Sequence, residues 1–264
     1  MKKMKKIKEW IIKLVRKYGY DIVKIKPRSY LSDGYASHYE SSLLSLLSKT
    51  EKLNIIVVGA NDGMVGDPIY DFVRLFPERT RLLLVEPQKE LIPQLEENYA
   101  FHPDYKVFHG AVGPEKKLKL YSVDKSAWKY VSKKRQKDWP EHRASTGRTS
   151  PDRQILKKWL ETITDDDMDV DEMISEDVVP CKKLCDILEA SDFAHTIDVL
   201  QVDTEGFDDQ VIYNADIDDL QPNVILFEIS LLGEQRLKRV KSYLREKGYF
   251  ISNLKRDAIA FKTS

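Results

Sequence analysis

Cysteine is nearly absent from the 264-residue sequence, and long apolar runs are missing altogether. Cys181 and Cys185 are too few for a disulfide scaffold and lack the partners of a zinc site. No apolar stretch approaches the roughly 18–20 residues of a membrane span, and the lysine-rich N-terminus has no continuous apolar segment like that of a signal peptide. We therefore expect reduced thiols and a cytoplasmic protein.

The net charge is zero, because the 43 Lys and Arg residues are balanced by 43 Asp and Glu residues. This balance gives no global electrostatic reason for binding nucleic acid, and no nucleic-acid partner is expected. The length and the 42% hydrophobic content allow one sizeable core. We expect one catalytic domain with an appendage rather than two full domains.

The first twenty residues hold eight basic side chains against a single acid, Glu9. Apolar residues recur there at three- and four-residue intervals, namely Met4, Ile7, Trp10, Ile11, Leu14, Val15 and Tyr18. This spacing predicts a basic amphipathic helix. Its role stays open between peripheral contact with the inner membrane face or a partner, and packing against the catalytic domain's own edge. The oligomeric state is not predicted.

Four branched apolar residues, Ile55 to Val58, run directly into the loop Gly59-Ala60-Asn61-Asp62-Gly63. This pattern predicts a buried parallel strand that ends in a ligand-binding loop. Glycine can adopt backbone angles closed to other residues and lets a ligand approach the main chain, and asparagine tolerates the left-handed region. Packing alone would also explain the glycines.

A second apolar run, Arg81 to Val85, ends in Glu86 and Pro87, just over twenty residues after the glycine loop. A carboxylate at this position can accept hydrogen bonds from both hydroxyls of a ribose. Together the two strands predict a nucleotide-like ligand.

Three motifs, Val58–Gly63, Val85-Glu86-Pro87 and Val202–Gly206, with Phe227-Glu228 later, resemble the FkbM family of S-adenosylmethionine (SAM)-dependent methyltransferases. The resemblance covers about residues 54–261. It implies an α/β fold, a doubly wound Rossmann-like class I methyltransferase sheet of seven strands whose last hairpin is antiparallel. It also implies SAM as methyl donor and a sugar or natural-product hydroxyl as acceptor.

The resemblance also assigns residues to the donor site. They are Gly59, Ala60, Asn61 and Gly63 in the loop, Glu86 and Pro87 at the ribose, Ala111 and Val112 beside the adenine, and Asp203. Family members commonly carry Asp two residues before the first loop glycine, where this chain has Val57. A non-catalytic interaction module with the same fold is therefore an alternative.

Residues 1–53 are expected to form the amphipathic helix and a helical cap over the donor pocket, and residues 54–264 the methyltransferase domain. Residues 122–178 read as an insertion between the third and fourth strands, either a substrate lid or a solvated excursion. Its first part is basic and rich in tryptophan, and its acidic segment 165–177 is expected to be mobile or solvated.

Three acids follow or end core strands and are the candidates for chemistry: Asp203, Glu205 and Glu228. Methyl transfer to a hydroxyl needs alignment and removal of a proton. One acid could act as base, or a pair could hold a divalent metal ion that lowers the hydroxyl pKa. Capping of backbone groups by Glu205 and Glu228 is the alternative.

The acceptor is expected to be a glycan or a nucleotide- or lipid-linked sugar. Lys133, Lys134 and Arg135 of the insertion would hold its phosphate, and neighbouring aromatic rings would stack on the sugar. Two rival activities remain. A nicotinamide oxidoreductase would need a fuller glycine fingerprint, and a nucleic-acid methyltransferase acting on amino groups would end its fourth strand in Asn/Asp-Pro-Pro-aromatic rather than Asp-Thr-Glu-Gly.

Overall fold

The computed structural model describes residues 33–135, 140–165, 168–193 and 195–263. The predicted basic helix near the N-terminus lies outside these residues. Within them, no helix has both the length and the apolar character needed to cross a membrane.

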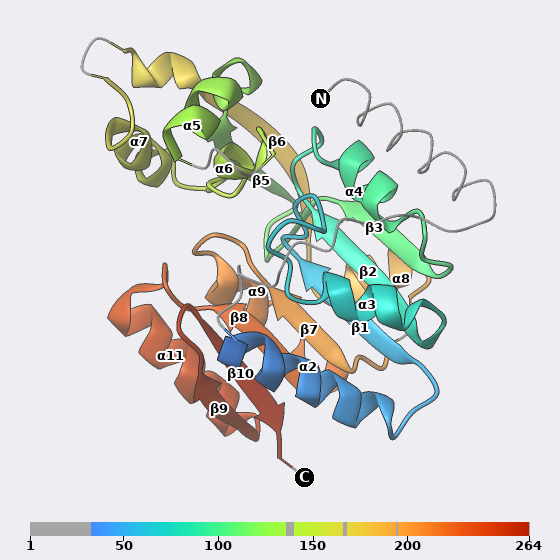
Figure 1. Cartoon of the computed structure of the whole chain (residues 1–264). Coiled ribbons are helices and arrows are strands. Elements are labelled where there is room, and N and C mark those ends of the chain that lie inside the picture. The colour runs from blue at the N-terminus through green and yellow to red at the C-terminus, as the bar shows by residue number, and fades with distance from the viewer. Residues whose placement is uncertain (1–32, 136–139, 166–167, 194, 264) are drawn as a thin grey trace, which may run out of the picture.

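The central sheet has seven strands in the order β3-β2-β1-β7-β8-β10-β9 (Figure 1). Their bounds are β1 Leu53–Val58, β2 Thr80–Glu86, β3 Tyr105–His109, β7 Val199–Val202, β8 Val224–Glu228, β9 Tyr249–Asn253 and β10 Asp257–Lys262. Every neighbouring pair is parallel except those of β10, which runs antiparallel to β8 and β9. The prediction of a doubly wound class I methyltransferase sheet with a closing antiparallel hairpin is therefore confirmed.

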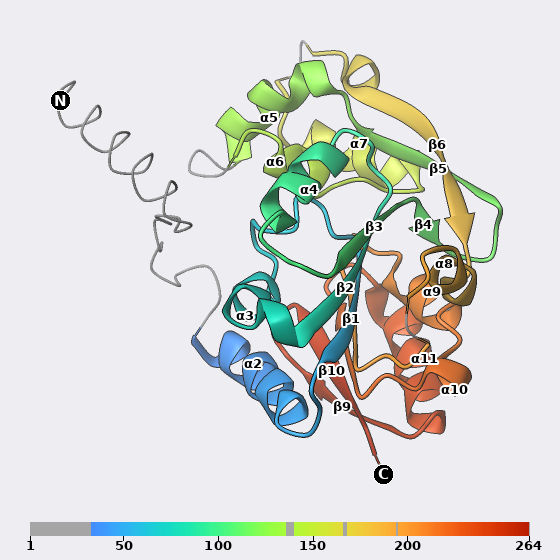
Figure 2. The ribbon, with the colours of Figure 1, turned by 90° about the vertical axis from the view of Figure 1, so that its right-hand side faces the viewer.

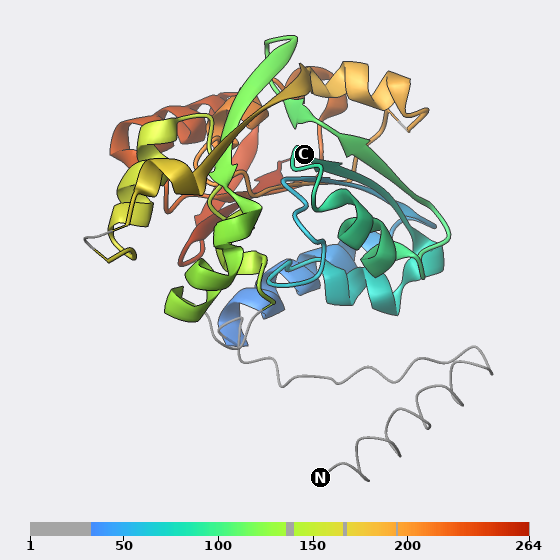
Figure 3. The same ribbon diagram turned by 90° about the horizontal axis from the view of Figure 1, so that it is seen from above.

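Helices cover both faces of this sheet, as Figure 3 shows from above. One face carries α2 (Asp33–Leu47), α3 (Tyr70–Leu75) and α4 (Ile92–Tyr99), and the other carries α8 (Leu184–Ala190), α9 (Asp208–Tyr213), α10 (Ile217–Leu220) and α11 (Gly233–Glu246). Two hydrophobic cores result, one on each face. Strands buried on both faces read as continuous apolar runs, which is why β1, β2 and β8 could be predicted from sequence.

The helix α2 does not cap the donor pocket as expected. Its Tyr39 and Leu43 are fully buried against the face of the sheet, and the Tyr39 hydroxyl donates a hydrogen bond of 3.2 Å to Gln201 of β7. None of its described side chains lines the pocket discussed below. For the described side chains of α2 the cap expectation was wrong, because the apolar side of this helix completes the core.

The insertion forms a small unit beside the sheet (Figures 1 and 2). Its elements are α5 Trp128–Arg135, α6 Arg143–Thr146 and α7 Arg153–Glu161, with the 3-10 turns Lys125–Ala127 and Val170–Met173. It is flanked by β5 Lys117–Val123 and β6 Ile174–Lys182, which extend beyond residues 122–178, and β4 Ala111–Val112 lies beside them. The strands form a second sheet in the order β4-β6-β5. Side chains such as Val131, Leu156 and Leu160 form its own core, and the rings of Trp128 and Trp159 pack against that core.

The acidic segment is more ordered than its composition suggested. Asp171 accepts ion pairs of 2.6 Å from both Arg153 and Lys157, and Asp165 lies 2.8 Å from Lys134. The strand β6 begins at Ile174 and pairs with β5 over seven residues. Residues 168–177 thus form defined turns and a strand, in which Asp171 pairs with basic residues of the same insertion, while Asp169, Asp171, Glu172 and Glu176 stay exposed to solvent, as the solvated alternative predicts.

Gly59 lies where β1 and β7 end side by side. Its φ is +82°, and a Cβ atom at this position would lie 1.9 Å from the carbonyl oxygen of Asp203. Beside it, the Asp203 amide donates to the Val58 carbonyl at 3.0 Å. The two loops meet at van der Waals distance only because residue 59 has no side chain.

We predict that Gly59→Ala lowers the free energy of unfolding by about 3 kcal/mol or more. A filled site costs about 1–3 kcal/mol to overpack, and a left-handed backbone angle adds about 1–2 kcal/mol for a residue with Cβ. Gly233→Ala is the matched control, since φ is +63° there and the Cβ position is open. Denaturant unfolding of the two variants should separate them, and equal losses would mean that the close approach to Asp203 has no energetic weight.

Candidate functional site

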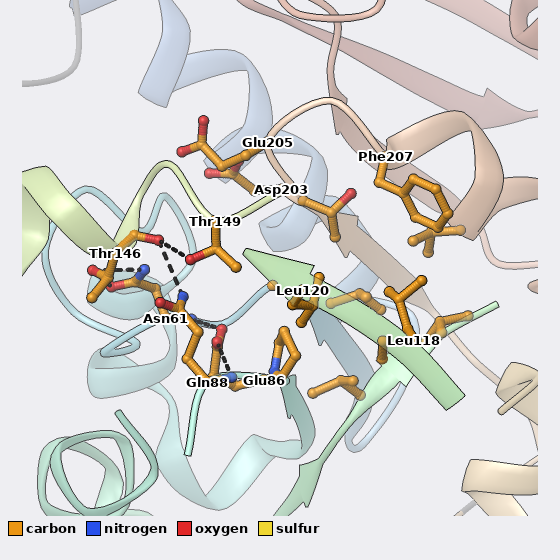
Figure 4. Close-up of a pocket in the computed structure, with 18 of the residues that line it drawn as sticks. Asn61, Glu86, Gln88, Leu118, Leu120, Thr146, Thr149, Asp203, Glu205 and Phe207 are labelled. Carbon is orange, nitrogen blue, oxygen red and sulfur yellow. Dashed lines mark hydrogen bonds between the residues drawn. The ribbon is translucent and has the colours of Figure 1, made fainter. Parts of the chain in front are cut away.

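A pocket of about 660 Å³, counted to its open mouth, lies at the carboxyl edge of the sheet (Figure 4). It is bounded by the ends of β1, β2 and β7, by β4 and β5, by the start of α9 and by the segment around α6. Ligands bind at this edge in open α/β sheets. Of the predicted site residues, those that line it are Gly59, Asn61, Glu86, Pro87, Ala111, Val112, Asp203 and Glu205.

Glu86 ends β2 and lies almost fully buried in the pocket wall, with 2% of its surface exposed. Its two carboxylate oxygens accept hydrogen bonds from the amides of Asn61, at 2.7 Å, and Gln88, at 2.8 Å. Burial raises the pKa of Glu86 to about 7. Each carboxylate oxygen can accept more than one hydrogen bond, so these contacts orient the group and still leave it able to accept hydroxyls from a ribose.

Asn61 has φ of +52°, the left-handed conformation expected from sequence. Its side chain contacts Thr146 Oγ1 of α6 at 3.2 Å, and the side chain of Gln88 donates to the Thr146 carbonyl at 3.1 Å. Figure 4 shows these residues together at one end of the pocket. The donor loop and the insertion are therefore joined directly.

Ala60 and Gly63, also predicted to bind the donor, shape the loop without lining the pocket. Ala60 is buried in the core, and its amide donates to the Val85 carbonyl at 3.1 Å. A Cβ atom at Gly63 would lie 2.4 Å from the ring of Tyr99 and 2.5 Å from Leu95. Both residues permit the turn that brings Gly59 and Asn61 to the pocket.

Asp203 and Glu205 follow β7 and face the same pocket (Figure 4). Burial, and then the charge of Glu228, raises the pKa of Asp203, while burial and then the charge of Asp203 raise the pKa of Glu205. Glu205 has φ of +51°, an uncommon angle for a residue with a side chain. Its Oε2 atom lies 3.5 Å from Arg148 of the insertion.

Glu228 ends β8 but does not line the pocket. It is 4% exposed, and its Oε1 atom accepts hydrogen bonds from Ser230 and from Arg256, the latter at 2.7 Å. Of the three candidate acids, Asp203 and Glu205 therefore line one pocket and Glu228 does not. In the described part of the chain, no group of three or more His, Cys, Asp or Glu side chains is arranged to hold a metal ion.

Asp208, which sequence reasoning missed, holds the loop that carries these acids. It is fully buried, its Oδ2 atom accepts from the Thr204 hydroxyl at 3.1 Å, and its Oδ1 atom accepts from the Glu228 amide at 3.1 Å. Burial raises its pKa well above the usual range. The sequence signal that could have identified Asp208 is an acid in the first turn of a helix, two residues after Gly206.

The segment around α6 was also missed. His142 Nε2 lies 2.8 Å from Asp62 Oδ2, and Arg143 Nε donates to the Val65 carbonyl at 2.9 Å. Burial alone would raise the pKa of Asp62, but the hydrogen bonds from His142 and from two backbone amides lower it overall. These contacts hold α6 against the donor loop. The lining residues from this segment are Arg143, Thr146, Gly147, Thr149 and Pro151.

Lys133 and Lys134, the predicted acceptor-binding residues, lie exposed on α5 and do not line the pocket. Lys134 pairs with Asp165 and lies 5.5 Å from the centre of the Tyr130 ring. Arg135 ends the same helix, and its side chain lies outside the described part of the chain.

The opposite end of the pocket is apolar, with Leu118 and Leu120 of β5 near Phe207 (Figure 4). Val211 of α9 also lines the pocket. A flat heteroaromatic ring would bury well against these side chains, next to Ala111 and Val112. The pocket thus combines an apolar end, a carboxylate at Glu86 and two further carboxylates at Asp203 and Glu205. This suits an adenosine that carries a cationic extension.

Several solved structures resemble the chain weakly. They include a precorrin-6y C5,15-methyltransferase from Geobacter metallireducens (10% identity, 93% of this chain and 95% of that chain, TM-score 0.41). Others are fibrillarin from Aeropyrum pernix with natively bound SAM (13%, 86% and 74%, 0.39) and a ribosomal protein L11 methylase from Lactobacillus delbrueckii (12%, 88% and 83%, 0.37).

No curated protein is significantly similar to the chain in sequence. Residues 58–251 match the family model described as the methyltransferase FkbM domain. The matched range spans the donor loop, the insertion, β7 with its acids, β8, α11 and the start of β9. That match covers well over half of the sequence, and the strand order is the one expected for a methyltransferase of this class. The chain belongs to the FkbM family of SAM-dependent methyltransferases.

Proposed function

We propose that the protein transfers the methyl group of SAM to a hydroxyl group of a sugar or glycan. The observation that carries this proposal is the pair of carboxylates, Asp203 and Glu205, which line the same pocket as the donor loop. Hydroxyl acceptors need a base, whereas the donor itself needs only alignment.

The donor would bind with its ribose hydroxyls on Glu86 and its adenine between Val112 and the apolar end of the pocket. Its methionine portion then extends past Gly59 toward Asp203 and Glu205. The sulfonium is a cation, and two carboxylates nearby match its charge. In this pose the methyl group would lie on the side of the pocket that the acids face.

In the reaction, a lone pair of the acceptor oxygen attacks the methyl carbon in line with the carbon–sulfur bond. That bond breaks, its electrons remain on sulfur, and S-adenosylhomocysteine leaves as a neutral thioether. The hydroxyl proton passes to a carboxylate, for which we assign Glu205. Its backbone angle and its position opposite Arg148 hold the carboxylate at the pocket.

Sugar is the acceptor class that best fits these groups. Carboxylates such as Asp203 and Glu205 can accept hydrogen bonds from adjacent hydroxyls of one ring, and the guanidinium of Arg148 can donate to others. Arg148 lies 5.6 Å from the centre of the Trp159 ring and is held there. Lys134 of α5 already pairs with Asp165. We therefore expect the acceptor to contact Arg148 rather than the basic residues of α5.

A direct test is to incubate the purified protein with labelled SAM and a panel of free sugars, nucleotide-linked sugars, lipid-linked sugars and glycans. We expect label in a methyl ether, identified by its methoxy signal in the NMR spectrum. Transfer to carbon or nitrogen, or to a non-sugar natural product in preference to every sugar, would contradict the proposal.

We predict that Glu86→Ala weakens SAM binding by roughly tens of fold, measured by calorimetry. Charge-assisted hydrogen bonds contribute about 1.5–3 kcal/mol each, and about 1.4 kcal/mol corresponds to tenfold in affinity. Glu97→Gln, an exposed acid on α4, serves as the control and should leave affinity unchanged. Unchanged affinity in Glu86→Ala would remove Glu86 from the ribose site.

We predict that Glu205→Gln lowers kcat about 100-fold or more, since a positioned base contributes about 10²–10⁴ in rate, and that the loss in rate exceeds the loss in SAM affinity. Burial raises the pKa of Glu205, so the ionised base forms only as pH rises through that raised value. The rate of the unaltered enzyme should therefore rise with pH well above the usual carboxyl range. The rise should be lost in Glu205→Gln.

Asp203→Asn, measured beside Glu205→Gln, shows which acid acts. Each variant is assayed for SAM affinity and for rate, with and without a chelator. Full activity in both would exclude the carboxylates from the mechanism.

A further inference from the structure

The pocket holds three carboxylates and a single basic side chain among its described lining residues. The carboxylates are Glu86, Asp203 and Glu205, and the basic side chain is Arg143 of α6. The donor carries a sulfonium, an ammonium and one carboxylate. The first two charges match the acids, but the third is an anion that must enter a pocket already rich in carboxylates.

A buried carboxylate without a cationic partner costs several kcal/mol, and a neighbouring carboxylate adds to that cost. Arg143 is the lining group that can offset it. We propose that Arg143, a residue of the insertion, binds the carboxylate of the methionine portion of SAM. This inference rests on the function proposed above and adds to it a specific role for the insertion.

The position of Arg143 supports this role. Its Nε atom donates a hydrogen bond to the Val65 carbonyl, which holds the guanidinium beside the segment that follows the donor loop. A Cβ atom at Gly147 would lie 2.5 Å from Arg143 Nη1 and 3.2 Å from Glu205 Oε1, so both charged groups reach the pocket beside Gly147. The absence of a side chain at Gly147 lets them do so.

The positive charge of Arg143 influences the acids at both ends of the pocket. Burial raises the pKa values of Glu86, Asp203 and Glu205, and the positive charge of Arg143 acts in the opposite direction on all three. The guanidinium therefore lies within electrostatic range of both the ribose end and the acid end. An amino-acid extension running from one end to the other passes within its reach.

The anchoring of α6 adds a second argument. His142 contacts Asp62 and Thr146 contacts Asn61, so the residues on both sides of Arg143 are attached to the donor loop. With these contacts in place, the insertion completes the donor site.

The test uses two ligands that differ only in the carboxylate, SAM and decarboxylated SAM, with calorimetry on the full chain. The unaltered protein should bind SAM more tightly by about tenfold or more. Arg143→Gln should weaken SAM by roughly tens of fold and change the affinity for decarboxylated SAM less than twofold, so the preference disappears. Arg143→Lys, which keeps the charge but loses the fork geometry, should fall between.

Arg153→Gln is the matched control, because Arg153 lies in the same insertion and pairs with Asp171 away from the pocket. It should leave both affinities unchanged. If Arg143→Gln weakens both ligands equally, or unfolds the insertion as judged by thermal melting, Arg143 is structural and the inference is overturned. Equal binding of the two ligands by the unaltered protein overturns it without any variant.

The result also separates this inference from the proposed function. Failure of the unaltered protein to bind SAM at all would contradict the donor assignment itself. SAM binding without discrimination against the decarboxylated ligand would contradict only the role of Arg143.

Discussion

The site depends on the contact between the ends of β1 and β7. The backbone of Gly59 lies against the carbonyl of Asp203, and the Asp203 amide donates a hydrogen bond to the Val58 carbonyl. This contact joins the donor loop to the loop after β7 that carries Asp203 and Glu205. The two loops are far apart in sequence. Parallel pairing of the strands sets the register, and the missing side chain at residue 59 sets the distance.

The parts of the molecule that follow local rules could be predicted from the sequence. Buried parallel strands give continuous apolar runs, so β1, β2 and β8 stand out, and Glu86 and Asp203 follow from their places at strand ends. Val57 stands where family members commonly carry Asp. Its side chain is buried in the core, on the face of the sheet that α2 and α3 cover. A polar group on that face comes instead from Gln201, which contacts Tyr39 and Asp67.

The role of the insertion could not be predicted in the same way. Its charge pattern suggested surface capture of an anion, but Lys134, Arg153 and Lys157 pair with acids of the same insertion. The residues that reach the pocket, such as Arg143 and Thr146, carry no spacing signal because their positions depend on how α6 docks on the donor loop. Composition indicates that a segment is charged and does not indicate which charges remain for a ligand.

Charge balance then links the two parts of the site. Burial raises the pKa values of Glu86, Asp203 and Glu205, so the protonated form of each carboxyl group is favoured. A protonated Glu205 could not accept the proton of the acceptor hydroxyl. A cation about 4 Å away stabilises an ionised carboxylate by about 4 kcal/mol at an effective dielectric constant of 20. Under the proposed mechanism, the sulfonium and ammonium of the donor would supply that stabilisation, while Arg143 would offset the charge of the donor's own carboxylate. The donor would thus help to ionise the base that its methyl transfer requires, and the insertion would allow the carboxylate of the ligand to enter an acidic pocket.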